Sequence, residues 1–150
     1  MSRLDPRRGA VPDPARMDLD TLKRWIDEIG YRAEQQDPAT LRVRPREEGI
    51  AVFPPFFVQR TESWVVLSMF DVLGDEAQLI DDLPVRLLEA NREMRLVKFA
   101  LDERDRPLLS AELPTESLDR SELSDAVERL IEYATTYRRA LLGLVATARR

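Results

Sequence analysis

The C-terminal segment constrains the fold of this chain more than any other part of the sequence. From Asp119 to Ala148 there is no proline and a single glycine, Gly143. Asp119 and Glu122 have the spacing of a capping box, which marks a helix start. Apolar residues then recur at alternating steps of four and three, as in a heptad seam: Leu123, Val127, Leu130, Ala134, Tyr137, Leu141, Leu144 and Ala148. The pattern predicts one long C-terminal helix with an apolar stripe.

Such a helix poses a packing question, because about 30 residues give a length of roughly 45 Å. A domain of this size has a radius of gyration of only about 15 Å. In one interpretation the whole stripe packs against the domain's own sheet. In the other, the distal part from Tyr137 to Ala148 extends past the sheet and contacts a second subunit or a client.

The rest of the chain alternates between helix and strand patterns. Residues 1–16 hold three prolines and four arginines and are expected to form a flexible arm, followed by a single domain over 17–150. Apolar periodicity and turn residues predict helices over 19–29 and 84–93, and strands over 31–35, 40–44, 50–53, 56–60, 64–70, 96–101 and 107–113.

Short turns between these strands indicate antiparallel pairing. The expected fold class is therefore α+β: an antiparallel sheet built in the order helix, strands, helix, hairpin, long C-terminal helix. The nearly continuous apolar run over 64–70 predicts a central strand covered on much of both faces. In the second helix, Leu83, Leu87, Leu88 and Met94 are expected to face the core, with Asp82 as its cap.

Missing residue types exclude much of enzyme chemistry. The 150 residues include no cysteine and no histidine, so thiolate nucleophiles, histidine bases and the usual transition-metal ligands are absent. Lys23 and Lys98 are the only lysines, and the other cations are arginines, which do not act as ordinary bases. We therefore expect no catalytic residues, no cofactor and no metal.

Acidic clusters leave one enzymatic alternative, a metal-dependent hydrolase. Carboxylates can hold magnesium or calcium, and Asp71 with Asp75 is the only pair we would nominate. Charge runs of this kind are usually solvated turns, which makes this the weakest of the functional hypotheses.

Charge and hydropathy also bear on partners and location. The formal net charge of −5 disfavours nucleic acid and anionic membranes as partners. The N-terminus lacks the apolar stretch of an export signal, and no window approaches the ~20 apolar residues of a membrane span. A cytoplasmic location is expected.

Aromatic residues cluster in the middle of the chain, at Phe53, Phe56, Phe57, Trp64 and Phe70. A stacking platform for single-stranded nucleic acid carries interleaved cations, and here only Arg60 is close. Most of these rings are expected in the core, whereas some, Phe56 beside the prolines above all, are expected to form an exposed groove for another chain. The candidate protein-binding residues are Phe56, Phe57, Trp64, Tyr137, Leu141 and Leu144.

Three stretches of the sequence resemble the YbjN-like proteins, which are similar in fold to the type III secretion chaperones. They are Pro54-Pro55-Phe56-Phe57-Val58-Gln59 followed by Trp64-Val65-Val66-Leu67, then Leu87-Leu88-Glu89-Ala90-Asn91-Arg92-Glu93-Met94, then Lys98-Phe99-Ala100-Leu101-Asp102. The resemblance covers about 19–142. It implies a non-enzymatic protein, because secretion chaperones are commonly homodimers that hold a partly extended client on apolar patches.

Residues and resemblance together predict a chaperone-like or adaptor protein that binds a partner polypeptide and forms a homodimer. YbjN-like proteins are often described as sensory-transduction regulators, so a regulator that acts through transient protein contacts is the alternative.

Overall fold

The computed structural model describes residues 17–46 and 53–148, with side chains described as far as Val145. The expected arm over 1–16 and all but Phe53 of the expected strand over 50–53 lie outside the described residues. The elements are α1 (Leu19–Glu28), β1 (Tyr31–Asp37), β2 (Thr40–Pro45), β3 (Phe56–Arg60), β4 (Trp64–Met69), the 3-10 helix η1 (Asp75–Leu79), α2 (Leu83–Glu93), β5 (Lys98–Leu101), β6 (Pro107–Pro114) and α3 (Arg120–Ala148).

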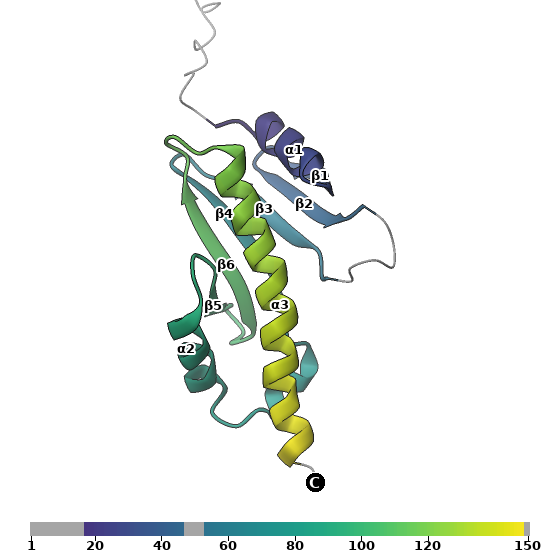
Figure 1. Ribbon diagram of the computed structural model, residues 1–150, viewed down its shortest axis with the longest axis vertical. Helices are drawn as coiled ribbons and strands as arrows, with labels where there is room; N and C mark the ends of the chain where they lie inside the picture. Colours follow the sequence, from purple (N-terminus) through teal and green to yellow (C-terminus); the bar gives the residue numbers. More distant parts are fainter. Residues whose placement is uncertain (1–16, 47–52, 149–150) are drawn as a thin grey trace, which may run out of the picture.

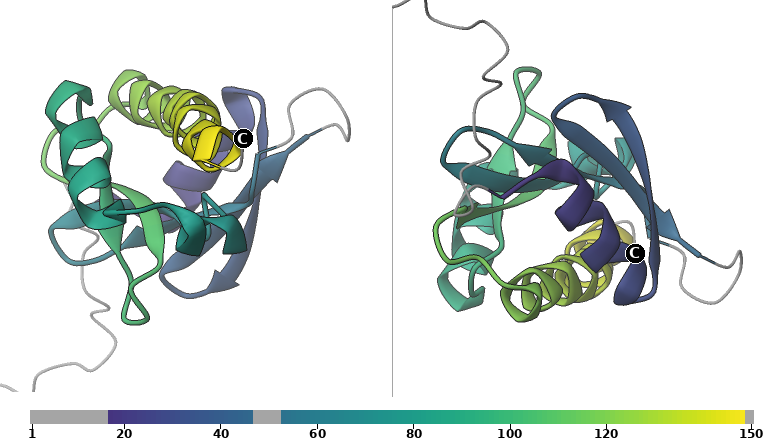
Figure 2. Two further views of the ribbon diagram at one scale, coloured as in Figure 1. Left: turned by 90° about the horizontal axis from the view of Figure 1, so that it is seen from below. Right: turned by 90° about the horizontal axis from the view of Figure 1, so that it is seen from above.

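The strands form one six-stranded sheet in the order β1-β2-β3-β4-β6-β5, and every neighbouring pair is antiparallel. The sheet curves around α1 and α3, which lie together on its concave side (Figures 1 and 2). Arg120 at the start of α3 donates to Glu28 at the end of α1 over 2.8 Å, which ties the two helices together. The expected α+β class and element order are confirmed.

Local signals in the sequence set the ends of α1. The Asp18 carboxylate accepts a hydrogen bond from the Thr21 amide over 2.7 Å, which satisfies one of the free donors at the helix start. Hydrogen bonding from the Thr21 side chain, together with this amide bond, holds the pKa of Asp18 below its ordinary value. Gly30 follows the helix with φ of 105°, a conformation that glycine adopts at low cost.

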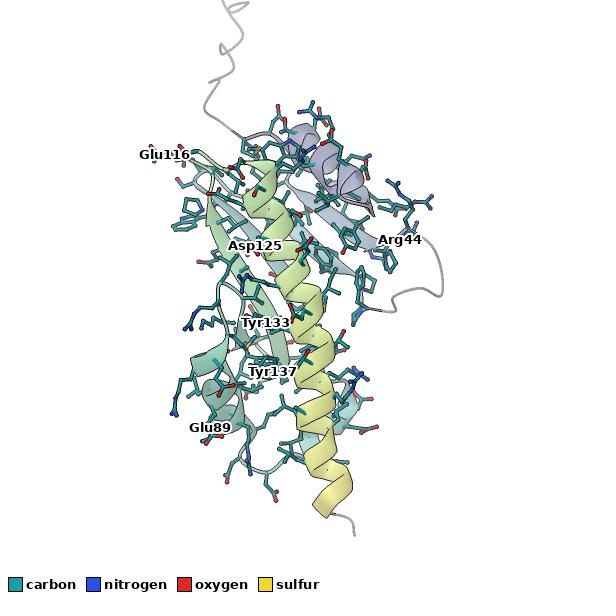
Figure 3. The ribbon with its side chains drawn as sticks, viewed as in Figure 1. Arg44, Glu89, Glu116, Asp125, Tyr133 and Tyr137 are labelled. Carbon is teal, nitrogen blue, oxygen red and sulfur yellow. The ribbon has the colours of Figure 1, made fainter. Side chains whose placement is uncertain are left out.

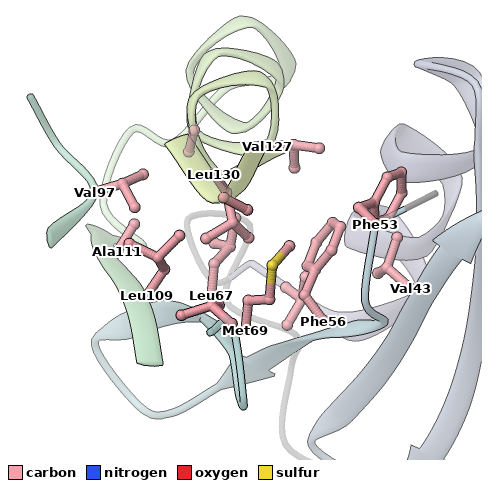
Figure 4. Packing of buried hydrophobic residues seen from close by; sticks show 14 of the residues in the cluster. Val43, Phe53, Phe56, Leu67, Met69, Val97, Leu109, Ala111, Val127 and Leu130 are labelled. Atoms are coloured by element: carbon pink, nitrogen blue, oxygen red, sulfur yellow. The ribbon is translucent and has the colours of Figure 1, made fainter. Parts of the chain in front are cut away.

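The core lies between the concave face of the sheet and the two helices (Figure 4). Alternate residues of β4 and β6 point into it, as the twofold period of a strand requires. Leu67, Met69, Leu109 and Leu130 are fully buried there. The side chains of this concave face, which we call the inner face, meet α3 directly.

The opposite face corrects one expectation. On β4 the burial pattern alternates strictly, and Trp64 at its start is exposed. The prediction that this strand is covered on much of both faces is therefore wrong, although its central position in the sheet is confirmed. The apolar residues that alternate with the core residues, Trp64 and Val66, therefore lie on a face of the sheet that no helix covers, and they do not form a second core.

The distal half of α3 passes beyond the sheet and is covered by the domain's own chain. In Figure 1 the helix runs past the end of β6 toward the segment that contains η1. Arg138 donates from Nη1 to the Val72 carbonyl oxygen over 3.0 Å. Leu141 and Val145 are each only 6% exposed, so most of the stripe packs within the domain. In the part of the chain that the structure describes, no helix is long and apolar enough to cross a bilayer.

Both edges of the sheet are tied at one point to the helix that precedes them. At the β1 edge, the Ala33 amide donates to the Asp27 carboxylate over 3.3 Å. At the β5 edge, the Asn91 side chain pairs with both backbone groups of Phe99: its amide nitrogen donates to the carbonyl over 3.1 Å, and its oxygen accepts from the amide over 2.7 Å. Asn91 thus makes the two bonds that a neighbouring strand would make.

Candidate functional site

The most exposed aromatic surface lies on the convex side of the sheet, which we call the outer face. Trp64 and Phe70 are 44% and 45% exposed. Phe57 is half-buried and its ring packs edge-on against that of Phe70, with centroids 6.0 Å apart. Val66 lies between the ends of this patch on β4, so the apolar strip runs along one strand.

Strand register places polar groups around this strip. Ser68 is paired with both Phe57 of β3 and Ser110 of β6, and Val66 is paired with Gln59 and Glu112. A patch of apolar rings bordered by hydroxyl, amide and carboxylate groups has the composition of a protein-binding surface, in which an apolar centre is surrounded by a polar rim.

Phe56 and Phe57 are adjacent but lie on opposite faces. Phe56 is fully buried, and its ring lies 5.9 Å from that of Phe53. The expectation that Phe56 lines an exposed groove is therefore wrong. The physical reason is the pleat of β3, which turns alternate side chains to opposite sides. Of the aromatic candidates, Phe57 and Trp64 reach the outer face.

The three candidates on α3 lie elsewhere, on the inner side of the sheet. The Tyr137 ring packs edge-on against Phe99 and Tyr133, with centroids 5.9 and 5.8 Å away. Figure 3 shows both tyrosines on one side of α3, and the Tyr133 hydroxyl accepts a bond from the Arg95 amide just beyond α2. Burial, with the negative charge of Glu93 nearby, raises the pKa of Tyr137 above its ordinary value.

Leu141 and Leu144 differ in exposure, although they are three residues apart. Leu141 is buried at 6%, whereas Leu144 is 39% exposed. Leu141 therefore belongs to the core, and Leu144 is accessible to another chain. The structure does not bring the α3 candidates together with Phe57 and Trp64.

Besides the outer face and the exposed part of α3, an apolar surface lies on α2, and it was not predicted from the sequence. Val85 and Leu88 are 54% and 69% exposed, and their spacing of three places them on one side of the helix. The expectation that Leu88 faces the core is wrong, while Leu87 and Met94 are buried as expected. Asp82 does occupy the cap position of α2, but its side chain makes no capping bond.

The end of α2 leads into a strained turn at Leu96. The Val97 amide donates to the Arg95 carbonyl over 2.7 Å, and Leu96 between them has φ of 68°. This is the rare form of γ-turn, and it delays the start of β5 to Lys98. Leu96 is also 40% exposed, at a position whose positive φ is uncommon for residues other than glycine.

Asn91, Met94 and Lys98 are joined by hydrogen bonds that connect the end of α2 to the start of β5. Lys98 donates from Nζ to the carbonyl oxygens of Asn91, over 2.6 Å, and of Met94. A cation at these carbonyls stabilises the C-terminal end of α2. Together with the Asn91–Phe99 pairing, these bonds hold α2 against β5. Asn91, Met94 and Lys98, which belong to the stretches that resemble the YbjN-like proteins, thus have a structural role.

The two carboxylates of the hydrolase hypothesis lie in different surroundings. Asp71 pairs with Arg106 over 3.7 Å, and Asp75 is an exposed residue at the start of η1. Within residues 17–46 and 53–148, no group of three or more acidic side chains is arranged to hold a metal ion.

Comparison with solved structures relates the fold to secretion chaperones. The complex of ExoU with SpcU from the type III secretion system of Pseudomonas aeruginosa matches at 26% identity and a TM-score of 0.54, over 82% of this chain and 96% of that one. The Yersinia pestis chaperone SycH, in complex with a fragment of YscM2, matches at 18% identity and a TM-score of 0.55, over 78% and 96%.

The third structure is YbjN from E. coli, described as a transcription regulator. It matches at 19% identity and a TM-score of 0.55, over 89% of this chain and 93% of that one. No curated protein sequence matches the chain. The family model named YbjN, "Putative bacterial sensory transduction regulator", matches residues 18–143. Because this match spans most of the chain, the chain belongs to the YbjN family.

Proposed function

We propose that this chain is a non-enzymatic protein-binding domain, chaperone-like or adaptor, that holds a partner polypeptide on apolar surface of its sheet and helices. The observation that carries the proposal is the outer face, where Trp64 at the start of the central strand β4 and Phe70 just after its end are nearly half exposed. Large aromatic side chains contribute strongly to binding energy because their burial removes much apolar area from water.

Structural relatives support the same interpretation. SpcU and SycH are chains of similar fold whose structures contain a second protein, ExoU and YscM2 respectively. The fold is thus compatible with holding another polypeptide. That this chain binds a partner polypeptide, and through which surface, is our inference from its exposed apolar residues. We also propose that the protein acts in the cytoplasm.

Site-specific cross-linking tests the outer face. A photo-reactive phenylalanine replaces Trp64 in one variant and Thr136, an exposed residue of α3, in the matched control. We expect a protein that cross-links through position 64 and not through position 136. Titration of that purified partner should then show about thirtyfold weaker binding to Trp64→Ala, the loss typical of a hot-spot residue. Equal affinity of wild type and Trp64→Ala sinks the outer-face assignment.

Homodimerisation forms a separate part of the proposal and is assigned to α2. Val85, Leu88 and Leu96 are exposed aliphatic residues in and just after one helix, and a twofold dimer could bury all three from both copies. Light scattering should give twice the 17.3 kDa chain mass, and Leu88→Asp should give a folded monomer. If the wild-type chain is monomeric at all concentrations, the proposed homodimer is wrong.

A regulator that passes a signal through transient contacts is the second candidate, favoured by the description of the family. The lifetime and identity of the complex separate the two. A partner from a signalling pathway that dissociates within seconds favours the regulator, whereas a long-lived complex with an extended client favours the chaperone.

A further inference from the structure

A pocket beside α3 combines an apolar floor with two cations. It lies between α3 and two loop segments distant in sequence, and it measures about 270 Å³. Its lining consists of Phe53, Pro54, Val72, Ala134, Thr135, Arg138, Arg139 and Leu142. Phe53, Val72 and Ala134 are almost fully buried, so the floor is formed by residues of the hydrophobic core.

The size of the pocket fits one large side chain. A cavity of about 150 Å³ accepts benzene, so a volume of 270 Å³ accommodates a phenylalanine or leucine side chain with part of its backbone. The apolar floor would desolvate that side chain as a core does.

The pocket is lined by two arginines, Arg138 and Arg139. Arg138 is fixed by its bond to the Val72 carbonyl, which uses one of its five N–H donors. Arg139 is exposed, and in the part of the chain that the structure describes no carboxylate pairs with it or with Arg138. Two arginines that no described carboxylate pairs with are complementary to an acidic ligand, because a guanidinium can bind a carboxylate in bidentate geometry.

The geometry points to a specific ligand chemistry: this pocket receives an acidic segment of the partner polypeptide, with an aromatic or large aliphatic side chain on the floor and carboxylates on Arg138 and Arg139. The inference rests on the proposed function, because it names the kind of segment the partner presents. It adds a second contact surface, built from other elements than the outer face.

A designed peptide is the probe. It has twelve residues with a fluorescein label, a central phenylalanine flanked by aspartates, and glycine and serine elsewhere. Fluorescence anisotropy with the full chain should show saturable binding that weakens at high salt, because exposed charges are screened. Replacing the phenylalanine by glycine, or the aspartates by lysines, should each weaken binding about tenfold or more.

Paired substitutions locate the binding. Thr135 lines the pocket, whereas its exposed neighbour Thr136 does not, so Thr135→Trp should fill the site and weaken binding about tenfold while Thr136→Trp leaves it unchanged. Arg139→Glu should weaken binding similarly, and Arg104→Glu, an exposed arginine on the β5–β6 turn, should not. Arg139→Lys should restore most of the affinity.

Three outcomes overturn the inference. The first is the absence of saturable binding at millimolar peptide. The second is an equal effect of Thr135→Trp and Thr136→Trp, which would mean that the peptide does not enter this pocket. The third is an equal effect of Arg139→Glu and Arg104→Glu, which would mean that the peptide responds to overall charge. If the peptide fails while the cross-linked partner still depends on Trp64, the pocket assignment is wrong and the proposed function stands.

Discussion

The inner and outer faces of the sheet are built from alternate residues of the same strands, and both are rich in apolar side chains. On β4, Leu67 and Met69 are fully buried, whereas Trp64 is exposed and Val66 only half-buried. The difference arises from what lies above each face, since α1 and α3 cover only the concave side. Apolar composition therefore stabilises the fold on one face and provides a surface for another molecule on the opposite one.

The largest expected effect comes from Leu141 and Leu144 on α3. Leu141→Asp places an unpaired charge in the core and should lower the free energy of unfolding by about 3–5 kcal/mol. Leu144→Asp, at a position 39% exposed, should change it by less than about 1 kcal/mol. Urea denaturation followed by circular dichroism measures both. Similar losses in the two variants would contradict the assignment of Leu144 to the surface.

A smaller effect separates the two faces of β4 directly. Leu67→Ala removes buried methyl groups and leaves a cavity, at a cost of about 2–5 kcal/mol. Val66→Ala on the outer face should cost less than about 1 kcal/mol. Melting temperatures of the two variants under the same conditions make the comparison. If Val66→Ala destabilises as much as Leu67→Ala, another part of the chain covers the outer face.

Asn91 tests the contribution of one edge. Asn91→Ala leaves the Phe99 amide and carbonyl without their partners and should cost about 1–3 kcal/mol. Hydrogen exchange at the Phe99 amide should become faster, while Glu89→Ala on the exposed side of the same helix serves as the control. An unchanged exchange rate at Phe99 would show that the edge does not depend on Asn91.

The smallest expected effect is at the start of α1. Asp18→Ala removes the helix cap and should cost about 1 kcal/mol at neutral pH. The side chain and the amide of Thr21 lower the pKa of Asp18 in the folded state, so this stabilisation is present above the unfolded-state pKa and is lost as pH falls through the folded-state pKa. Asp18→Asn retains an acceptor oxygen without a titrating group. A loss that persists undiminished in strong acid would rule out the carboxylate as its source.

Much of the fold follows from local signals. The cap of α1, the apolar periodicity of α2, the Pro-free heptad stripe of α3 and the hairpin turns identify the three α-helices and most strand boundaries, because each of these signals depends on residues close in the sequence. The faces of the strands are different. In Phe56-Phe57 both residues are aromatic, so alternation carries no information about which one is buried. Only the register with β2 and β4 decides it.

The candidate surfaces were harder to predict for the same reason. Leu87 and Leu88 are chemically identical, and the position of α2 beside β5 determines which one is exposed. The pocket at Arg138 joins Phe53, Val72 and Ala134 from three separate segments, and no sequence pattern connects them. The strain at Leu96 also had no signal, because a leucine there gives no indication of a positive φ.

The side chains that tie the sheet edges have a consequence for solubility. Exposed edge strands act as templates on which identical chains can stack into fibrils. Here Asp27 occupies a donor of β1 and Asn91 occupies both groups of Phe99 on β5, and a bulge between Gln35 and Asp37 disturbs the end of β1. Neither edge therefore offers an uninterrupted ladder. The exposed aromatic rings lie on the face of the sheet, whereas stacking into fibrils requires free backbone groups along its edges. Hydrogen bonds with Asp27 and Asn91 occupy some of those edge groups.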